Sequence, residues 1–317
     1  MSDNKLYVSS SPHLRSDENT TKIMKDVIIA LIPAVIASLI FFGYNALITY
    51  VVAIISCVGF EKLSRKVMKR NNTTKDLSAV VTGVLLAMNL PCNINPFITV
   101  FGSLVAIVVV KQMFGGIGQN FVNPAITARI VLLVSFPVAM TTWTKPFFYI
   151  NTSDVDALSS ATPLTNITQG INTSYFDLFI GNVGGSMGET CALALIIGGV
   201  YLVIKKIISP IIPLCFIGTV FVMALCLGQD PIFHILSGGV MLGAIFMATD
   251  YTTSPMTKWG KVVFAIGCGI ITMLIRLYAN LPEGVSYSII LLNILVPHIE
   301  KITMPKPFGE EKKAWKK

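Results

Sequence analysis

Long uncharged apolar blocks dominate the chain, and short polar segments separate them. Residues 27–60 and residues 77–110 contain no charged side chain. Each block is too long for one membrane span of about 20 residues and suits two short spans joined by a turn. Polar breaks lie where those turns belong, at residues 43–45 and 89–96. Six more apolar segments follow, so the pattern predicts ten spans in all, the last six at 124–140, 190–204, 207–227, 232–249, 262–277 and 285–296.

The composition agrees with a lipid environment. Of the 317 residues, 53% are hydrophobic and 13% are charged, and the mean hydropathy is +0.72. An ordinary soluble domain carries about 25% charged residues. This chain has too few charged residues to cover a water-exposed surface of its size. The composition therefore excludes a soluble enzyme, a disordered chain and a secreted disulfide scaffold. It predicts an all-α polytopic membrane protein embedded in the lipid bilayer.

The Lys and Arg residues indicate the orientation of the spans. With the N-terminus in the cytoplasm, all but three of the 24 basic residues fall on the cytoplasmic side. The exceptions are Lys145 and Arg276, which fall outside, and Arg129, which lies within a span. Because cytoplasmic loops are enriched in Lys and Arg, this orientation is favoured and both termini are predicted to be cytoplasmic. The net charge of +8 is then a sign of topology, and no nucleic acid partner is expected.

The two halves of the chain resemble each other in the order of their segments. Residues 83–91 and 239–250 are spans rich in small residues that run into polar, proline-ended loops, and Met88 and Met247 occupy matching positions. Five spans in each half would enter the membrane from opposite sides, which is an inverted-topology repeat. The predicted organisation is a cytoplasmic N-terminal segment, a five-helix repeat, a polar extracytoplasmic loop, a second five-helix repeat and a basic cytoplasmic tail, at residues 1–26, 27–140, 141–188, 189–299 and 300–317.

This topology sorts the polar segments into two groups. Residues 89–96 and 282–288 would face outside, and residues 115–125 and 250–255 would face inside. Irregular polar backbone at membrane depth is tolerated only when it is buried in protein or lines a cavity. We therefore expect one polar site near each membrane face. The alternative is that these segments are ordinary turns with cap residues.

The polar loop contains the run Asp156-Ala157-Leu158-Ser159-Ser160-Ala161-Thr162. On the residues alone this run is a turn followed by a helix cap. No His or Lys lies close enough in sequence to activate a hydroxyl group as a nucleophile.

The same run resembles the flavinylation motif of a family of membrane proteins that contains RnfD of the Rnf complex and NqrB of the sodium-pumping NADH:quinone oxidoreductase. Ser160 stands where glycine is usual. Other family-like segments occur in the same order, at residues 11–16, 23–24, 30–33, 115–125, 246–255 and 283–288. The short polar segment before the first span favours the Rnf member of the family.

The resemblance implies a fold of ten transmembrane helices in two inverted five-helix repeats, in a bacterial cytoplasmic membrane. It implies FMN bound covalently to Thr162 through a phosphoester that a flavin transferase makes from FAD. It also implies a second, noncovalent flavin (riboflavin) nearer the cytoplasm. The expected function is electron relay between ferredoxin and NAD, together with the other proteins of the Rnf complex and coupled to Na⁺ or H⁺ movement. The chain would be part of this oxidoreductase and not catalytic alone.

The candidate cofactor-binding residues fall into an outer and an inner group. The outer group surrounds Thr162 and comprises Asp156, Ser159, Ser160, Ala161, Asn93, Glu283 and Ser286. The inner group would bind the isoalloxazine ring of the second flavin through amide and hydroxyl groups, and comprises Asn120, Asn123, Asp250 and Thr253. The alternative roles are turn formation for the outer group and helix capping for the inner one.

Arg129 is the most unusual charged residue, because an ion inside a membrane span is costly and usually functional. It could pair with Asp250, face an inner flavin or extend to the cytoplasmic surface. Arg276 and Glu189 are interpreted as interfacial residues near the outer surface. The three histidines are too scattered to indicate a metal site.

A solute channel or transporter is the main alternative function. Inverted repeats with polar segments near both faces suit such a protein equally well. The Ser-Ser-Ala-Thr segment at residues 159–162 discriminates between the two functions, because a channel has no need of a flavinylation motif.

Overall fold

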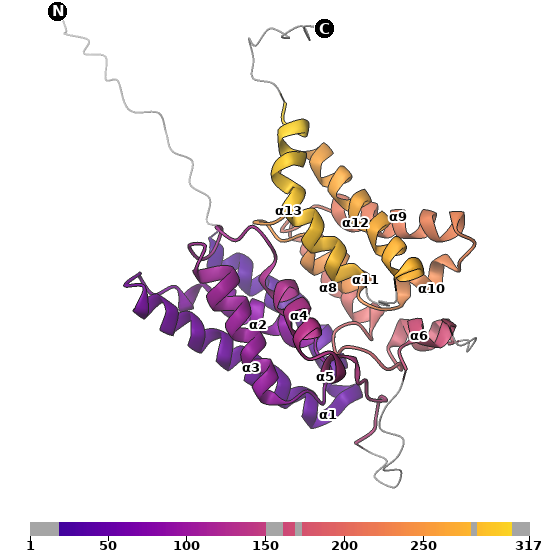
Figure 1. Ribbon diagram of the computed structural model, residues 1–317, viewed down its shortest axis with the longest axis horizontal. Coiled ribbons are helices and arrows are strands. Elements are labelled where there is room, and N and C mark those ends of the chain that lie inside the picture. Colours follow the sequence, from indigo (N-terminus) through magenta and orange to yellow (C-terminus); the bar gives the residue numbers. More distant parts are fainter. Residues whose placement is uncertain (1–18, 150–160, 169–172, 280–283, 306–317) are drawn as a thin grey trace, which may run out of the picture.

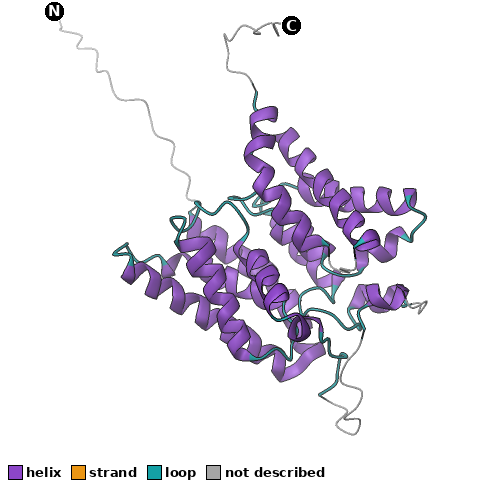
Figure 2. Ribbon diagram, in the orientation of Figure 1, coloured by secondary structure: helices purple, strands orange, loops and turns teal. Residues whose placement is uncertain are grey.

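The computed structural model describes residues 19–149, 161–168, 173–279 and 284–305. Helices joined by short loops account for most of this part of the chain (Figure 2). Helices α1–α5 gather on one side of the molecule and α9–α13 on the other, with α8 between them (Figure 1). The all-helical architecture agrees with the predicted polytopic membrane protein.

Helix α1, Thr20–Val67, contains 48 residues. A rise of about 1.5 Å per residue makes it longer than twice the roughly 30 Å hydrocarbon core of a bilayer. It bends at Gly43, where φ is 63° and ψ is −144°. A Cβ atom there would lie 2.7 Å from the Tyr149 ring, so both the backbone and the packing favour glycine. The bend falls in the predicted polar break at residues 43–45.

Shorter helices complete the fold. The first half continues with η1 (Thr74–Asp76), α2 (Ser78–Met88), α3 (Pro96–Leu104), the π-helix η2 (Val105–Gln112), α4 (Pro124–Ser135) and α5 (Pro137–Thr141). Helices α6 (Pro163–Thr168) and α7 (Tyr175–Ile180) lie between the halves. The second half contains α8 (Ala192–Ile204), α9 (Ile211–Cys226), α10 (Pro231–Leu236), α11 (Val240–Leu242), the π-helix η4 (Gly243–Met247), α12 (Lys258–Tyr278) and α13 (Val285–Thr303).

Two predicted spans are interrupted in the structure. The span at 124–140 breaks at Phe136, whose φ of −132° and ψ of 59° are not helical. Pro137 follows directly, and the residue before a proline is forced away from helical geometry. The span at 232–249 breaks at residues 237–239, where Gly238 has a φ of 63°. The second break places backbone beside a small cavity lined by Ser237 and Gly238.

Three helices within the described residues are long and apolar enough to cross a membrane, namely α1, α12 and α13. Five shorter apolar helices accompany them: Ser78–Met88, Pro96–Gln112, Pro124–Ser135, Ala192–Ile204 and Ile211–Cys226. This set agrees with a protein that crosses the membrane several times.

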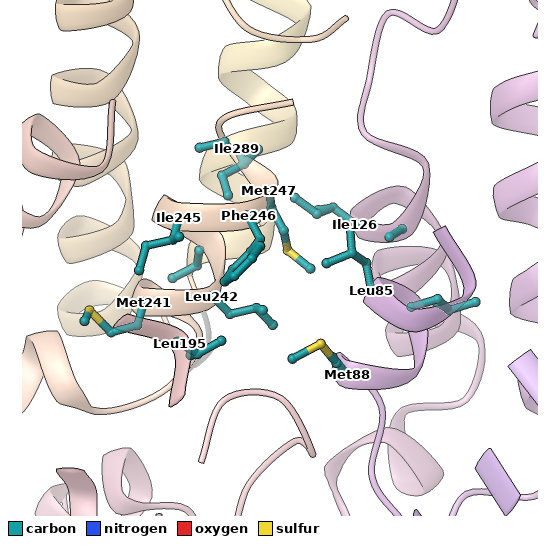
Figure 3. Packing of buried hydrophobic residues seen from close by; sticks show 14 of the residues in the cluster. Leu85, Met88, Ile126, Leu195, Met241, Leu242, Ile245, Phe246, Met247 and Ile289 are labelled. Carbon is teal, nitrogen blue, oxygen red and sulfur yellow. The ribbon is translucent and has the colours of Figure 1, made fainter. Parts of the chain in front are cut away.

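The two halves meet in a shared hydrophobic core. Leu85, Met88 and Ile126 from the first half point toward Phe246 and Met247 from the second half (Figure 3). Helix α13 also packs on α4, and α8 packs on α1. Burial of these apolar side chains holds the halves together.

The contact between α1 and α8 depends on a small residue. A Cβ atom on Gly198 of α8 would lie 2.1 Å from the backbone oxygen of Ala30 in α1. Because that neighbour is backbone, it cannot rotate away as the end of a side chain could. Gly198 therefore sets how closely the two helices approach each other.

We predict that Gly198→Ala lowers the free energy of unfolding by about 1–3 kcal/mol through overpacking. The matched control is Gly218→Ala in α9, where nothing lies within 4 Å of the added Cβ. That change should stabilise the helix by up to about 1 kcal/mol. Thermal unfolding of both variants in detergent tests the prediction, and equal melting temperatures for the two would contradict it.

Candidate functional site

The first candidate site is a cavity that lies where α2, η2, α4 and η4 begin or end. Its volume is about 380 Å³, within the range of small-molecule sites. Three of the predicted inner-site residues, Asn120, Asn123 and Asp250, line it. Thr253 is 2% exposed and donates to an oxygen of Asp250 at 3.3 Å, so it lies directly behind the cavity wall. The structure therefore brings the four inner candidates together.

Asn123 connects the two halves at this cavity. Its side-chain oxygen accepts from the backbone N–H groups of Ala125 and Ile126, at 3.1 and 3.3 Å, and so caps α4. Its amide nitrogen donates to the backbone oxygen of Met247 at 3.3 Å. Asn123 therefore has the helix-capping role that the sequence analysis gave as the alternative to flavin binding. The same side chain also joins the two halves.

Asp250 faces the cavity from the second half. The hydroxyl groups of Thr252 and Thr253 donate to its carboxylate, and Asn120 also bonds to it. Burial raises the pKa of the Asp250 carboxyl above its usual value, while these hydrogen bonds partly oppose the shift. The cavity therefore offers an amide and a carboxyl group to a ligand that both donates and accepts hydrogen bonds.

A buried ion pair borders the same cavity. The Nζ atom of Lys111 lies 3.1 Å from Oε2 of Glu61, and the two side chains are 4% and 0% exposed. Lys111 also donates to the hydroxyl group of Ser78 at 2.6 Å. Sequence reasoning missed this pair, although a signal was present. Glu61 and Lys111 are the first charged residues after the two uncharged blocks, and they have opposite charges.

Thr162 lies at a second site, between the halves. It is 6% exposed and precedes α6, and its hydroxyl oxygen lies 3.2 Å from that of Thr165. Leu164 of α6 packs with Leu178 of α7 and Phe233 of α10 in a separate apolar cluster. This packing holds Thr162 against the second half.

Two cavities adjoin Thr162. A small one of about 20 Å³ is lined by Thr162 together with Glu189, Thr190, Ser237 and Gly238, among others. A larger one of about 300 Å³ is lined by the flanking Ala161 and Pro163, with Lys145 and Asn182 among its other walls. Within the described residues, the hydroxyl groups of Thr190 and Ser237 have no hydrogen-bond partner. They are available to an acceptor placed beside Thr162.

Arg129 belongs to this second site. Its Nη1 atom lies 2.6 Å from Oε1 of Glu189 and donates to Oδ1 of Asn89 at 2.8 Å. Both charged side chains are at most 4% exposed. The predicted pairing of Arg129 with Asp250 was wrong, and Arg129 neither lines the inner cavity nor extends to the surface. The interpretation of Glu189 as interfacial was also wrong, because it is the buried partner.

Two of the outer candidates, Asn93 and Ser286, lie away from Thr162. Asn93 is exposed and bonds to Asn45, and Ser286 lies buried at the start of α13. Neither lines the two cavities beside Thr162. Arg276, expected at the interface, is half-buried and donates to the backbone oxygens of His234 and Ser237. The other predicted outer-site residues lie outside the described part of the chain: Asp156, Ser159, Ser160 and Glu283.

Comparison with known proteins decides the family. The NQR2, RnfD, RnfE family matches residues 7–309, which is nearly the whole chain. The chain belongs to this family.

Several similar proteins have a described function. The D subunit of the Na⁺-translocating ferredoxin:NAD⁺ oxidoreductase complex of Acetobacterium woodii is 50% identical, over 98% of both chains. The D subunit of the proton-translocating ferredoxin:NAD⁺ oxidoreductase complex of Clostridium ljungdahlii is 43% identical, over 96% of this chain and 97% of the relative. The D subunit of an ion-translocating oxidoreductase complex from Stutzerimonas stutzeri is 37% identical, over 91% and 92%.

We predict that Arg129→Gln lowers the free energy of unfolding by about 3–5 kcal/mol, because it removes the charged partner that lies 2.6 Å from the buried Glu189 carboxylate. Glu189→Gln should cost a similar amount by removing the carboxylate that Arg129 contacts. The double variant should be more stable than either single variant, since it removes both charges together. A double-mutant cycle of thermal unfolding in detergent checks this, and strictly additive losses would show that the two charges do not depend on each other.

Proposed function

We propose that this protein is the RnfD component of an ion-translocating ferredoxin:NAD⁺ oxidoreductase complex, and that it relays electrons through two flavins. Full-length similarity to the D subunits of two such complexes, and of a third ion-translocating oxidoreductase complex, supports the assignment. The family also favours this function over a solute channel. One relative is described as Na⁺-translocating and another as proton-translocating, so the coupling ion of this chain is left as Na⁺ or H⁺.

The observation that carries the flavin proposal is the surroundings of Thr162. An FMN phosphate esterified to Thr162 would be a negatively charged acceptor. The unpartnered hydroxyl groups of Thr190 and Ser237 line the small cavity on one side, where they suit its oxygens. The flavin ring is too large for a cavity of about 20 Å³, but the neighbouring cavity of about 300 Å³, bordered by Lys145, has room for a planar ring.

The attachment itself is assigned to a separate flavin transferase. The Thr162 oxygen would displace AMP from FAD, so that a phosphoester forms, the phosphoanhydride breaks and the hydroxyl proton leaves. No described basic side chain bonds to the Thr162 hydroxyl group, which agrees with activation by the transferase. Because Thr162 is only 6% exposed, we infer that it is modified before α6 packs against α7 and α10.

The inner cavity is proposed to hold the second, noncovalent flavin. Asn120 and Asp250 offer donor and acceptor groups to the polar edge of an isoalloxazine ring, and Val81, Leu85 and Phe246 supply apolar walls. The bound flavin would supply the electron-transfer chemistry, while the protein positions it and adjusts its electronic environment.

We further propose ten spans in two inverted repeats, with residues 141–188 outside the cell membrane. Figure 3 shows the predicted equivalents Met88 and Met247 in the same cluster of buried hydrophobic residues. Their shared place in the cluster that joins the two halves supports the repeat. The break at residues 237–239 resembles the discontinuous helices of other inverted-repeat membrane proteins.

We expect Thr162→Val to remove the flavin fluorescence of the protein band on a denaturing gel, because only a covalent flavin survives denaturation. The cells must also express the flavin transferase. Thr165→Val is the matched control, since Thr165 is the neighbouring hydroxyl group on the same segment and should leave the band fluorescent. A fluorescent Thr162→Val band would place the flavin on another residue, and a dark wild-type band would refute covalent attachment.

The proposed topology predicts that a cysteine at Asn166 reacts with an impermeant thiol reagent in intact cells. Cys226 is exposed and would lie on the same side, so the test starts from a Cys226→Ser background. Lys62→Cys in the basic segment after the first two spans serves as the control and should react only after lysis. The reverse labelling pattern would overturn the orientation.

A further inference from the structure

Lys111 is a buried cation at the wall of the inner cavity. The proposed electron relay through two flavins assigns no role to it. Lys111 lies at the end of the π-helix η2, and its side chain is 4% exposed while lining the cavity. A π-helix adds a residue to a turn and often marks a functional position. Here Lys111 and the adjacent Gln112 both reach Glu61 on α1. The cation is thus held firmly against the cavity.

The hydrogen bonds of Lys111 leave one donor available. A lysine ammonium group carries three N–H donors. One bonds to Glu61 at 3.1 Å and a second to the Ser78 oxygen at 2.6 Å. The Ser78 hydroxyl group in turn donates to Asp76 at 2.6 Å, so its oxygen is free to accept from Lys111. No further partner of Lys111 occurs among the described residues, and the third N–H is available to a ligand.

The carboxylate of Glu61 lies farther from the cavity than the ammonium group of Lys111 does. Glu61 is fully buried and does not line the cavity, whereas Lys111 does. The Glu61 carboxylate also accepts from Thr73 at 2.8 Å and from Gln112 at 3.2 Å, which fixes its position. A ligand in the cavity would therefore experience the positive end of this pair more strongly than the negative end.

We propose that Lys111 binds the acceptor edge of the flavin in the inner cavity and stabilises its reduced form over its oxidised form. This rests on the proposed inner flavin. Reduction adds negative charge to the pyrimidine edge of a flavin, so a fixed ammonium group there binds the reduced form more tightly. Charge near that edge is a recognised way for a protein to adjust a flavin. Glu61 and Ser78 hold the Lys111 side chain in place.

The experiment uses the purified complex and the double variant Glu61→Gln/Lys111→Gln. Changing both residues avoids leaving one buried charge unpaired, which would damage the fold. The complex is washed extensively in the oxidised and in the reduced state, and the retained riboflavin is extracted with acid and separated from phosphorylated flavins. This measures the relative affinity for the two redox forms.

We expect the variant to lose reduced riboflavin about tenfold more readily than the wild-type complex does, with little change for the oxidised form. For a two-electron couple this corresponds to a fall of about 30 mV in the midpoint potential. Lys62→Gln is the matched control, because Lys62 adjoins Glu61 but is exposed, and it should change neither value. A merely structural role would lower retention equally in both redox states.

The experiment distinguishes failure of the inner flavin proposal from failure of the proposed role of Lys111. A wild-type complex without extractable riboflavin would refute the proposed inner flavin itself. A wild-type complex with riboflavin, and a variant whose ratio of reduced to oxidised retention is unchanged, would refute the role of Lys111 alone.

Discussion

The buried ion pair between Arg129 and Glu189 is the interaction on which the arrangement of the halves depends. A charge in an apolar interior is tolerated only when an opposite charge and further hydrogen bonds compensate it. Arg129 comes from α4, Asn89 ends α2, and Glu189 precedes α8, so the pair joins the first half to the start of the second. Glu189 also lines the small cavity beside Thr162. One compensated charge pair therefore fixes how the halves meet and borders the proposed attachment site.

The same principle recurs at the other cavity, where Glu61 compensates Lys111. Each candidate flavin site thus adjoins a neutralised ion pair inside an apolar core. Such pairs contribute little net stability and are better understood as fixed charges that a nearby group can sense. A cofactor whose own charge changes during its reaction is the kind of ligand for which these fixed charges matter.

The sequence pattern predicted the helical class and the inner cluster, but it did not predict the charge pairs. Apolar blocks and polar breaks are local signals, so the bend at Gly43 and the meeting of Asn120, Asn123 and Asp250 could be expected. Arg129 and Glu189 lie far apart in sequence, and only the packing of α4 against the segment before α8 brings them together. The interrupted spans at Phe136 and Gly238 had local causes in proline and glycine that the apolar pattern concealed.

Peptide mass spectrometry of the purified complex tests the central claim, flavin attachment at Thr162, most directly. The account predicts a peptide containing residues 156–165 with the added mass of one FMN less one water, and fragment ions that place the addition on Thr162. An unmodified peptide from cells that express the flavin transferase, or fragments that place FMN on Ser159 or Ser160, would contradict it.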